Sequence, residues 1–389
     1  LRPGRRQRDC GKGARGSCQG TAARAGSGGA LNPRMVLPAL ALTQPRSAAV
    51  PPADRAIAFW LIACCAMIFA MVLIGGITRL TESGLSITEW QPVTGVVPPL
   101  SHAQWVAEFD RYKAIPQYEA IHPEMTLAQF KGIFFWEYLH RLWGRLIGVV
   151  FAVPFLYFLL RGRISRGLAP KLAGLFVLGG LQGALGWYMV ESGLVHRIEV
   201  SQYRLAAHLA LAVAIYAAML WVALDLLVPR PAAAERGTSR LRQGASLVFG
   251  LVFLTMIAGA FVAGLRAGYI YNTFPLMGGS FAPGEYAHLT PFVRNWFENP
   301  AAAQFDHRLL AETTWLIIAA LWAVSLRVAL APRARWALHA LFAMATVQAS
   351  LGIATLLLVV PLPLAVTHQG GAVLLLTAAL VARHALRRG

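Results

Sequence analysis

The chain alternates between long apolar blocks and polar connections. Each block is about as long as the ~20 residues that an α-helix needs to cross a bilayer core. The blocks run roughly over 56–78, 133–160, 171–190, 203–228, 244–264, 304–330, 336–360 and 363–386. Because backbone polar groups in hydrocarbon must be hydrogen-bonded within their own segment, each block is predicted to be one helix. The pattern therefore predicts an all-α membrane protein with eight transmembrane helices.

The charged residues identify which connections lie on the cytoplasmic side. Lys and Arg are in excess in alternate connections and at the C-terminal end, over 161–171, 230–242, 327–335 and 383–388. The other connections that we compared, 79–131, 191–202 and 361–367, hold no such excess. Since a Lys/Arg excess marks the cytoplasmic side, both termini are predicted inside and the long segment 79–131 outside.

Composition supports this class and excludes two others. Hydrophobic residues make up 57% of the 389 residues and charged residues only 13%, whereas an ordinary soluble domain is about a quarter charged. A net charge of +18 in a soluble protein would indicate a nucleic-acid partner. Here the charge lies in an N-terminal tail and in short connections, so we expect no nucleic-acid partner.

The domain organisation follows from the same pattern. The first 55 residues are basic and rich in Gly, Ala, Arg and Pro, without apolar periodicity, which predicts disorder. Met35 is the first methionine, and we interpret residues 1–34 as a stretch before the native start. The expected parts are a tail over 1–55, an N-terminal four-helix half over 56–228, a cytoplasmic linker over 229–243 and a C-terminal four-helix half over 244–386.

The two halves contain matching motifs. Glu137-Tyr138-Leu139-His140-Arg141 corresponds to Gln304-Phe305-Asp306-His307-Arg308. Further along, Leu181-Gln182-Gly183-Ala184-Leu185-Gly186 corresponds to Val347-Gln348-Ala349-Ser350-Leu351-Gly352. Repeats that are separated by four spans keep the same orientation. We therefore expect two parallel four-helix-bundle repeats about an axis along the membrane normal.

Four histidines stand near the starts of even-numbered helices: His140, His208, His307 and His368. Even-numbered helices run in one direction, so the four side chains should lie at similar depth. Two imidazoles on facing helices are natural axial ligands of a heme iron. Zinc is disfavoured because no Cys or carboxylate cluster completes a tetrahedral site. The alternative is that each histidine is an interfacial helix-end residue, but their matching places in a repeat favour two heme sites, one in each half.

Arginine and glutamate accompany these histidines. Arg141 and Arg308 directly follow His140 and His307, and a guanidinium can make paired hydrogen bonds to a heme propionate. The equally weighted alternative is that both arginines extend toward lipid headgroups.

Glu137 distinguishes the two halves. It precedes His140 by three residues and shares its helix face, whereas the matching residue in the second half is Gln304. A carboxyl group can take or donate a proton, so we infer one reactive heme site and one electron-transfer or structural site. The alternative is that Glu137 is a helix-end acid near the positive end of the helix dipole.

Longer motifs resemble one family. Gly75-Gly76-Ile77-Thr78-Arg79-Leu80-Thr81-Glu82-Ser83-Gly84-Leu85-Ser86-Ile87-Thr88-Glu89-Trp90, followed by Gln91-Pro92-Val93-Thr94-Gly95 and Pro98-Pro99, resembles the loop after the first helix of heme A synthase. The stretch 137–141 with Gly144-Arg145 is similar to that family's second-helix motif. The resemblance covers about 56–386, the whole membrane part.

This resemblance implies an oxidoreductase that converts heme O to heme A for cytochrome oxidase. The family oxidises a ring methyl to a formyl group by successive hydroxylations with water-derived oxygen. By resemblance, His307 and His368 would bind the iron of a resident heme b, His140 and His208 would hold the substrate heme, and Glu137 would be the catalytic carboxyl.

The resemblance also implies a setting. Some bacterial members carry a cysteine pair in outer loops, which this chain lacks, so it is similar to the mitochondrial and proteobacterial branch. We expect a multi-pass protein of the bacterial inner (plasma) membrane, with the mitochondrial inner membrane as the alternative. Expected partners are heme O, heme O synthase and the cytochrome oxidase assembly machinery. The redox partner and a homo-oligomeric state are left open.

Three other functions fit parts of the pattern. A di-heme cytochrome b linked to quinol would share the four histidines. A non-catalytic oxidase assembly factor would tolerate loss of Glu137. A transporter with parallel repeats would need broken helices at the membrane midplane, for which Gly179-Gly180 is the only indication in the sequence.

Overall fold

The computed structural model describes residues 51–91, 94–194, 197–228 and 238–387. In those residues it contains eleven α-helices, eight of which are long and apolar enough to cross a membrane. The eight are α1 (Pro52–Leu80), α4 (Leu127–Leu160), α5 (Ala169–Leu194), α6 (Gln202–Leu227), α7 (Thr238–Gly264), α9 (Pro300–Ser325), α10 (Pro332–Leu357) and α11 (Leu362–Ala385). The all-α class and the eight spans predicted from the apolar blocks are confirmed.

Several helices extend beyond the apolar blocks because polar residues can continue or cap a helix outside hydrocarbon. Helix α4 begins six residues early, at a capping box in which Thr126 and Gln129 exchange side-chain and backbone hydrogen bonds. Helix α1 begins at Pro52, a residue type suited to the first helical position, so the last residues of the predicted tail are helical. Residues 1–50 of that tail lie outside the described residues.

The predicted linker and the end of α9 also differ in detail. Residues 238–243 of the linker belong to α7, and residues 229–237 lie outside the described part of the chain. Helix α9 ends at Ser325, five residues before the apolar block does. The next helix starts with Pro332 at its first position, and the residue before a proline favours an extended backbone, as Ala331 shows with φ −56° and ψ 146°.

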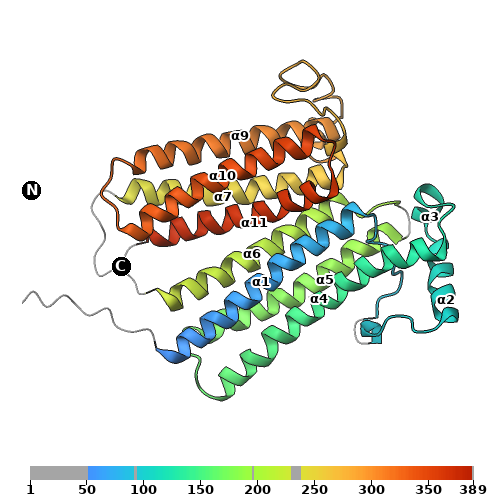
Figure 1. Ribbon diagram of the computed structural model, residues 1–389, viewed down its shortest axis with the longest axis horizontal. Helices are drawn as coiled ribbons and strands as arrows, with labels where there is room; N and C mark the ends of the chain where they lie inside the picture. The colour runs from blue at the N-terminus through green and yellow to red at the C-terminus, as the bar shows by residue number, and fades with distance from the viewer. Residues whose placement is uncertain (1–50, 92–93, 195–196, 229–237, 388–389) are drawn as a thin grey trace, which may run out of the picture. The chain divides into compact units, whose positions relative to one another are not determined.

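The eight long helices form two groups of four. In the first helix group, α1 packs against α4 and α6, and α5 packs against α4 and α6. In the second helix group, α7 packs against α9 and α11, and α10 packs against α9 and α11. The groups meet where α6 contacts α7 and α11 and where α1 contacts α11 (Figure 1). The histidine-bearing helices α4 and α6 lie in the first helix group, and α9 and α11 lie in the second.

The core between the helices is apolar and contains many small side chains. Leu61 of α1, Val248 of α7 and Leu376 of α11 are fully buried in it. Alanines that are also buried include Ala217, Ala223, Ala245, Ala379 and Ala382. Small residues let helix backbones approach closely, which favours association in lipid, where apolar burial gives little driving force.

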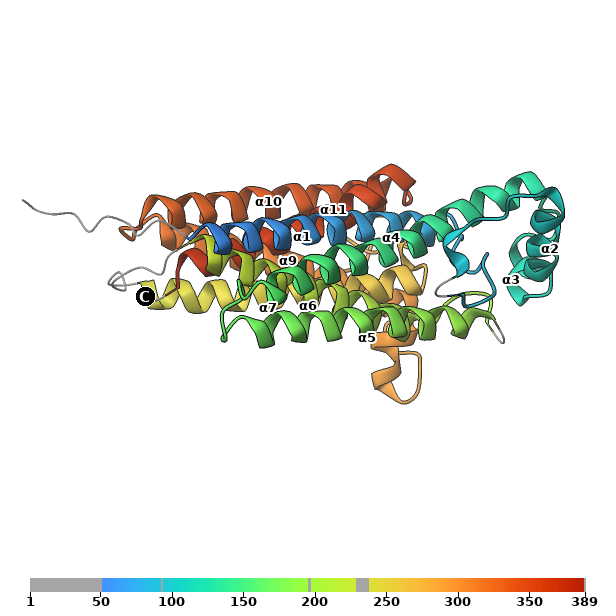
Figure 2. The same ribbon diagram turned by 90° about the horizontal axis from the view of Figure 1, so that it is seen from below.

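One end of the bundle carries the longer connections, and we call it the long-loop end. Helices α1, α5, α7 and α10 end there, and α4, α6, α9 and α11 begin there. The segment between α1 and α4 holds η1 (Thr94–Val96), α2 (His102–Lys113) and α3 (Pro116–Ile121), and the segment between α7 and α9 holds η2 (Ala267–Tyr269), η3 (Phe292–Arg294) and α8 (Asn295–Glu298). Figure 2 shows α2 and α3 beside the start of α4 and beyond the ends of the other long helices.

Candidate functional site

The four predicted histidines lie toward the long-loop end on four different helices. His208 of α6, His307 of α9 and His368 of α11 lie within about the first two turns of their helices. His140 lies more than three turns into α4, because α4 starts earlier than its apolar block. The four helices that carry these histidines all begin at the long-loop end, so all four imidazoles lie toward that end.

The structure groups these histidines by half. His140 lies near His208, and His307 lies near His368. The first pair joins α4 to α6, and the second joins α9 to α11. Each pair therefore comes from two helices of one helix group.

Each imidazole lies against a glycine of a neighbouring helix. A Cβ atom added to Gly75 of α1 would lie 3.3 Å from Nε2 of His140, and one added to Gly186 of α5 would lie 2.9 Å from Cε1 of His208. In the second helix group, a Cβ atom on Gly259 of α7 would lie 3.1 Å from Cε1 of His307. On Gly352 of α10 it would lie 2.8 Å from Cε1 of His368. Helices that carry a histidine thus pack against helices that provide a glycine.

Three of the four rings have a hydrogen-bond partner. Nδ1 of His307 lies 3.1 Å from the carbonyl oxygen of Thr255 in α7. Nδ1 of His208 lies 3.1 Å from the amide nitrogen of Gln182, and Nδ1 of His368 lies 3.1 Å from that of Gln348. Among the described residues, no group forms a hydrogen bond with the ring of His140.

The residues present fit a planar group bound between two imidazoles. The glycines let helix backbone come close to each ring, where any side chain would displace the imidazole. Donation from Nδ1 of His307 to the Thr255 carbonyl leaves Nε2 of that ring unprotonated, which is the form that binds a metal ion. Two imidazoles from facing helices in apolar surroundings are the donor set of a bis-histidine heme.

Glu137 is buried beside the first histidine pair, with 2% of its surface exposed. Its Oε2 accepts hydrogen bonds of 2.7 Å from the Ser86 hydroxyl and from the Ile87 backbone N–H. Its Oε1 accepts one of 2.6 Å from Arg141. The same guanidinium donates to the carbonyls of Ile87 and Glu89. We call this set, Glu137 and Arg141 with Ser86–Glu89, the first loop anchor, because it fixes the segment after α1.

A corresponding second loop anchor fixes the segment after α7. The amide nitrogen of Gln304 donates to the carbonyls of Ala267 and Ile270, at 2.7 and 2.6 Å. Arg308 donates to the carbonyls of Tyr271 and Thr273 and to Oε1 of Gln304. The first segment thus presents hydrogen-bond donors to position 137 and the second presents acceptors to position 304. This difference accounts for an acid at one position and an amide at the other.

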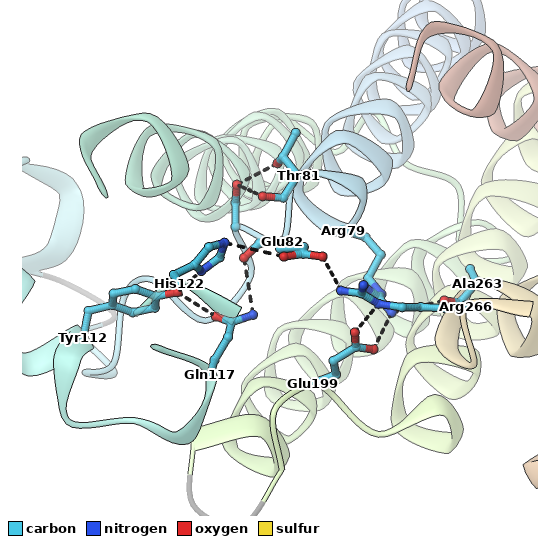
Figure 3. Close-up of polar contacts among 10 residues, drawn as sticks. Arg79, Thr81, Glu82, Tyr112, Gln117, His122, Glu199, Ala263 and Arg266 are labelled. Carbon is cyan, nitrogen blue, oxygen red and sulfur yellow. Dashed lines mark hydrogen bonds and ion pairs between the residues drawn. The ribbon is translucent and has the colours of Figure 1, made fainter. Parts of the chain in front are cut away.

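Charged residues of both halves meet next to the anchors. Arg79 at the end of α1 donates to Glu199 at 2.7 Å and to the carbonyl of Ala263 in α7 at 3.2 Å. Arg266, which follows α7, forms ion pairs with both Glu82 and Glu199 (Figure 3). We call Arg79, Glu82, Glu199 and Arg266 the inter-half ion cluster. Arg79 belongs to the first half and contacts α7, whereas Arg266 follows α7 and pairs with two carboxylates of the first half. The cluster therefore ties the halves together.

The segment between α1 and α4 joins this cluster through buried polar groups. Nε2 of His122 lies 3.5 Å from Glu82, and its Nδ1 lies 2.7 Å from the Tyr112 hydroxyl (Figure 3). Burial raises the pKa of Tyr112 well above its usual range, and the carboxylates of Glu82 and Glu137 raise it further. Tyr112 therefore remains a neutral hydrogen-bond donor or acceptor at any physiological pH.

The sequence pattern did not single out the four glycines or the Thr255 carbonyl. In the matched motifs, Gly186 follows Gln182 by four residues and Gly352 follows Gln348 by four residues. This shared spacing was the feature of the sequence that could have indicated two of the glycines. The backbone contacts of Glu137 and Gln304 were not predictable from residue types, because they depend on where the segments after α1 and α7 fold back.

Comparison with known proteins is consistent with this geometry. A family model described as cytochrome oxidase assembly protein, COX15-CtaA, matches residues 58–380. A heme A synthase of Nitrosospira multiformis is 55% identical over 336 residues, which are 86% of this chain and 94% of that protein. One of Rhodospirillum centenum is 55% identical over 342 residues, 88% of this chain and 90% of that protein.

A human relative is also similar over most of its length. The heme A synthase COX15 of Homo sapiens is 46% identical over 343 residues, which are 86% of this chain and 84% of that protein. The match of the family model spans all eight long helices apart from the outermost residues of the first and last. The chain belongs to the cytochrome oxidase assembly protein family, COX15-CtaA.

Proposed function

We propose that this chain is a heme A synthase, a membrane oxidoreductase that oxidises the ring methyl of heme O to a formyl group. The observation that carries the proposal is the pair of histidines in each helix group, each ring packed on a glycine, in a chain whose relatives at 46–55% identity are heme A synthases. The product would serve cytochrome oxidase, in keeping with the description of the family.

We assign the second histidine pair to a resident heme b and the first pair to the substrate heme O. The hydrogen bond from Nδ1 of His307 to the Thr255 carbonyl orients that ring as an axial ligand in advance, and the ring of His368 has a polar partner in Gln348. His140 has no such bond among the described residues, so its ring can adapt as a substrate enters and leaves. A heme bound at His307 and His368 would supply an iron centre that accepts or relays electrons.

Glu137 is proposed as the carboxyl group that accepts a proton from the water molecule whose oxygen enters the product. Its burial and its place one helical turn before His140 put it on the side of the first histidine pair. The bonds from Ser86, Ile87 and Arg141 fix the orientation of the carboxylate. Each hydroxylation with water-derived oxygen releases two electrons and two protons, and an electron acceptor outside the chain must take the electrons.

The proposed propionate contacts differ between the two arginines. Both guanidinium groups donate hydrogen bonds to loop carbonyls, so contact with lipid headgroups is not the sole role of either arginine. Arg308 in addition has a buried Nε atom without a hydrogen-bond partner in the described part of the chain. That spare donor supports a propionate contact at Arg308 more directly than at Arg141.

We further infer that the halves are parallel repeats with both termini on the cytoplasmic side. The recurring glycine, glutamine and loop-anchor contacts support the repeat, and the Lys/Arg distribution supports the orientation. A bacterial inner membrane is the proposed location, with the mitochondrial inner membrane as the alternative. Heme O synthase would then be the enzyme that supplies the substrate.

Extraction of bound hemes tests this function. Hemes would be extracted with acid acetone from the purified full-length protein and separated by chromatography, for the wild type and for Glu137→Ala. We expect heme B with heme O or heme A in the wild type, and heme B with heme O or a hydroxylated intermediate in the variant. Heme B alone in both, at two per chain, would instead indicate a quinol-linked cytochrome b.

Glu137→Gln provides a sharper test of the carboxylate. The amide keeps one oxygen that can accept from Ser86 and Ile87 but loses the ion pair with Arg141, so the heme content of the variant is measured beside heme A formation to show that it folds and binds hemes. Removal of a general base typically slows a reaction by about 10²–10⁴-fold, and heme A formation should fall by that order. Normal heme A formation with both hemes bound would remove Glu137 from the chemistry and favour a purely structural anchor.

A further inference from the structure

Two glutamines at matching places contact two of the histidines. Nε2 of Gln348 in α10 lies 3.1 Å from Nδ1 of His368 and 2.9 Å from the His368 carbonyl oxygen. Nε2 of Gln182 in α5 lies 3.1 Å from Nδ1 of His208, 3.3 Å from its Nε2 and 3.0 Å from its carbonyl oxygen. Each glutamine stands one helical turn before the glycine that packs on the same ring, so one helix contacts the ring twice.

Both amides have an unused acceptor. Oε1 of Gln182 and Oε1 of Gln348 are buried and have no hydrogen-bond partner in the described residues. A buried carbonyl oxygen without a donor is unfavourable, and its occurrence at both matching positions calls for a donor that arrives in another state of the site. The nearest candidate is the histidine ring itself.

Iron binding supplies that donor. An imidazole that binds iron through Nε2 must carry its proton on Nδ1, so Nδ1 changes from acceptor to donor. A rotation of the glutamine side chain that keeps Nε2 on the histidine carbonyl oxygen and turns Oε1 toward the ring would present Oε1 to Nδ1–H. The amide would then donate one hydrogen bond and accept one, and neither of its polar atoms would lack a partner.

We infer that Gln348 and Gln182 are positioning residues that accept the Nδ1–H of His368 and His208 through Oε1 when these rings bind heme iron. The inference rests on the heme ligation proposed above. His307 has the equivalent acceptor already in place, the Thr255 carbonyl. Three of the four rings would then have a fixed tautomer and orientation, and the ring of His140 alone would have none.

The test compares three variants of the full-length protein in a His140→Ala background, which leaves the second site as the bis-histidine site. Hemin is titrated into each, and its dissociation, the low-spin electron paramagnetic resonance spectrum and the midpoint potential are measured. Gln348→Leu removes the acceptor, and Gln348→Glu keeps the shape and strengthens the acceptor. Gln369→Leu is the matched control, because Gln369 adjoins His368 but donates to the Val72 carbonyl of α1 at 2.9 Å.

We expect Gln348→Leu to bind hemin about 10–100-fold more weakly, the usual effect of losing a partner of a metal-binding histidine. Gln348→Glu should retain hemin and lower the midpoint potential, because a more basic imidazole stabilises ferric iron. Gln369→Leu should resemble the unsubstituted background in all three measurements.

Two outcomes would overturn the inference in different ways. Gln348→Leu with the affinity, spectrum and potential of Gln369→Leu, together with an unchanged potential in Gln348→Glu, would show that the amide does not act on the ring, while the proposed heme function stands. Wild-type protein that binds no hemin with low-spin character would overturn the heme function itself and the positioning role with it. If Gln348→Leu fails to fold, the potential of Gln348→Glu alone decides.

Discussion

At the residue scale, small side chains matter as much as the histidines. Four glycines lie where any Cβ atom would contact an imidazole, so the rings can approach helix backbone. Other glycines on the same helices, such as Gly183 of α5 and Gly250 of α7, have open space around them. Position relative to the histidine, rather than the glycine content of a helix, therefore defines the site.

Gly186→Ala should weaken the first histidine site. Its new Cβ atom would lie 2.9 Å from Cε1 of His208, so the ring must move, and we expect about 10–100-fold weaker heme binding, as for other changes next to a metal ligand. Heme content per chain and hemin titration provide the measurement.

Gly183→Ala is the matched control on the same helix. Nothing lies within 4 Å of its added Cβ atom, so heme content should be unchanged. The helix should gain about 0.5–1 kcal/mol in stability, because alanine loses less conformational entropy than glycine on folding. Equal heme content in the two alanine variants would show that the close approach at Gly186 has no functional effect.

At the scale of elements, the segment between α1 and α4 is a packed structure. Tyr112 and Phe130 are fully buried in a cluster with Leu85, Phe109 and Phe134, separate from the core of the bundle. The first loop anchor and His122 attach this cluster to the long-loop end. The segment is thus held at the long-loop end by a fixed arrangement of side chains.

The packing of the segment between α1 and α4 should weaken as the pH falls below about 6.5. Burial lowers the pKa of His122, an effect that Glu82 partly offsets. An unfolded histidine titrates near 6.5, so below that pH the unfolded segment binds more protons than the folded one. Stability is complete above this value and decreases with falling pH until the lower, folded pKa is passed.

Hydrogen exchange of the amides in α2 and α3 measures this effect. After correction for intrinsic exchange rates, protection should be higher at pH 7.5 than at pH 5.5. His122→Gln should remove the difference, since the amide does not titrate. The same pH difference in the variant would assign the effect to other groups.

At the scale of the whole molecule, the two helix groups are joined by helix packing and by charge. Helices α6 and α1 contact α7 and α11, and the inter-half ion cluster connects the segments after α1, α5 and α7. The ion cluster lies at the long-loop end, toward which the four histidines also lie.

A double-mutant cycle on Arg266 and Glu199 should detect this connection. The side chains are 40% and 18% exposed, so solvent screens the pair and the coupling energy should be only about 0.2–1 kcal/mol. Thermal unfolding in detergent of Arg266→Gln, Glu199→Gln and the double variant gives the value. Each single change removes two ion pairs, because Arg79 also pairs with Glu199 and Glu82 also pairs with Arg266, so each should be more harmful than the coupling energy alone. Strictly additive effects would mean that the Arg266–Glu199 pair does not help to join the halves.

Cysteine labelling tests the proposed orientation. In a variant without the natural cysteines Cys10, Cys18, Cys64 and Cys65, an impermeant maleimide should label Glu124→Cys in intact spheroplasts. It should label Arg163→Cys only after permeabilisation. The reverse pattern would invert the proposed topology and place the histidines toward the cytoplasm.

The number of spans, the helix class and the positions of the four histidines could be read from sequence, because apolar block length and residue type are local properties. The helix ends shifted by up to six residues, since the capping box at Thr126 and the polar start of α7 extend helices beyond the hydrophobic pattern. The asymmetry of Glu137 and Gln304 was also visible in the sequence, although its structural reason was not.

Only the tertiary structure decided which groups meet. The contacts of His368 with Gly352 and Gln348, of Glu137 with Ser86, and of Arg266 with Glu199 join residues on different helices or loops. Their distances depend on how closely helix backbones pack and where each loop returns, and periodicity along one chain does not encode either quantity. Sequence alone thus determined the elements and the candidate ligands, and the packing of helices determined how each ligand is held.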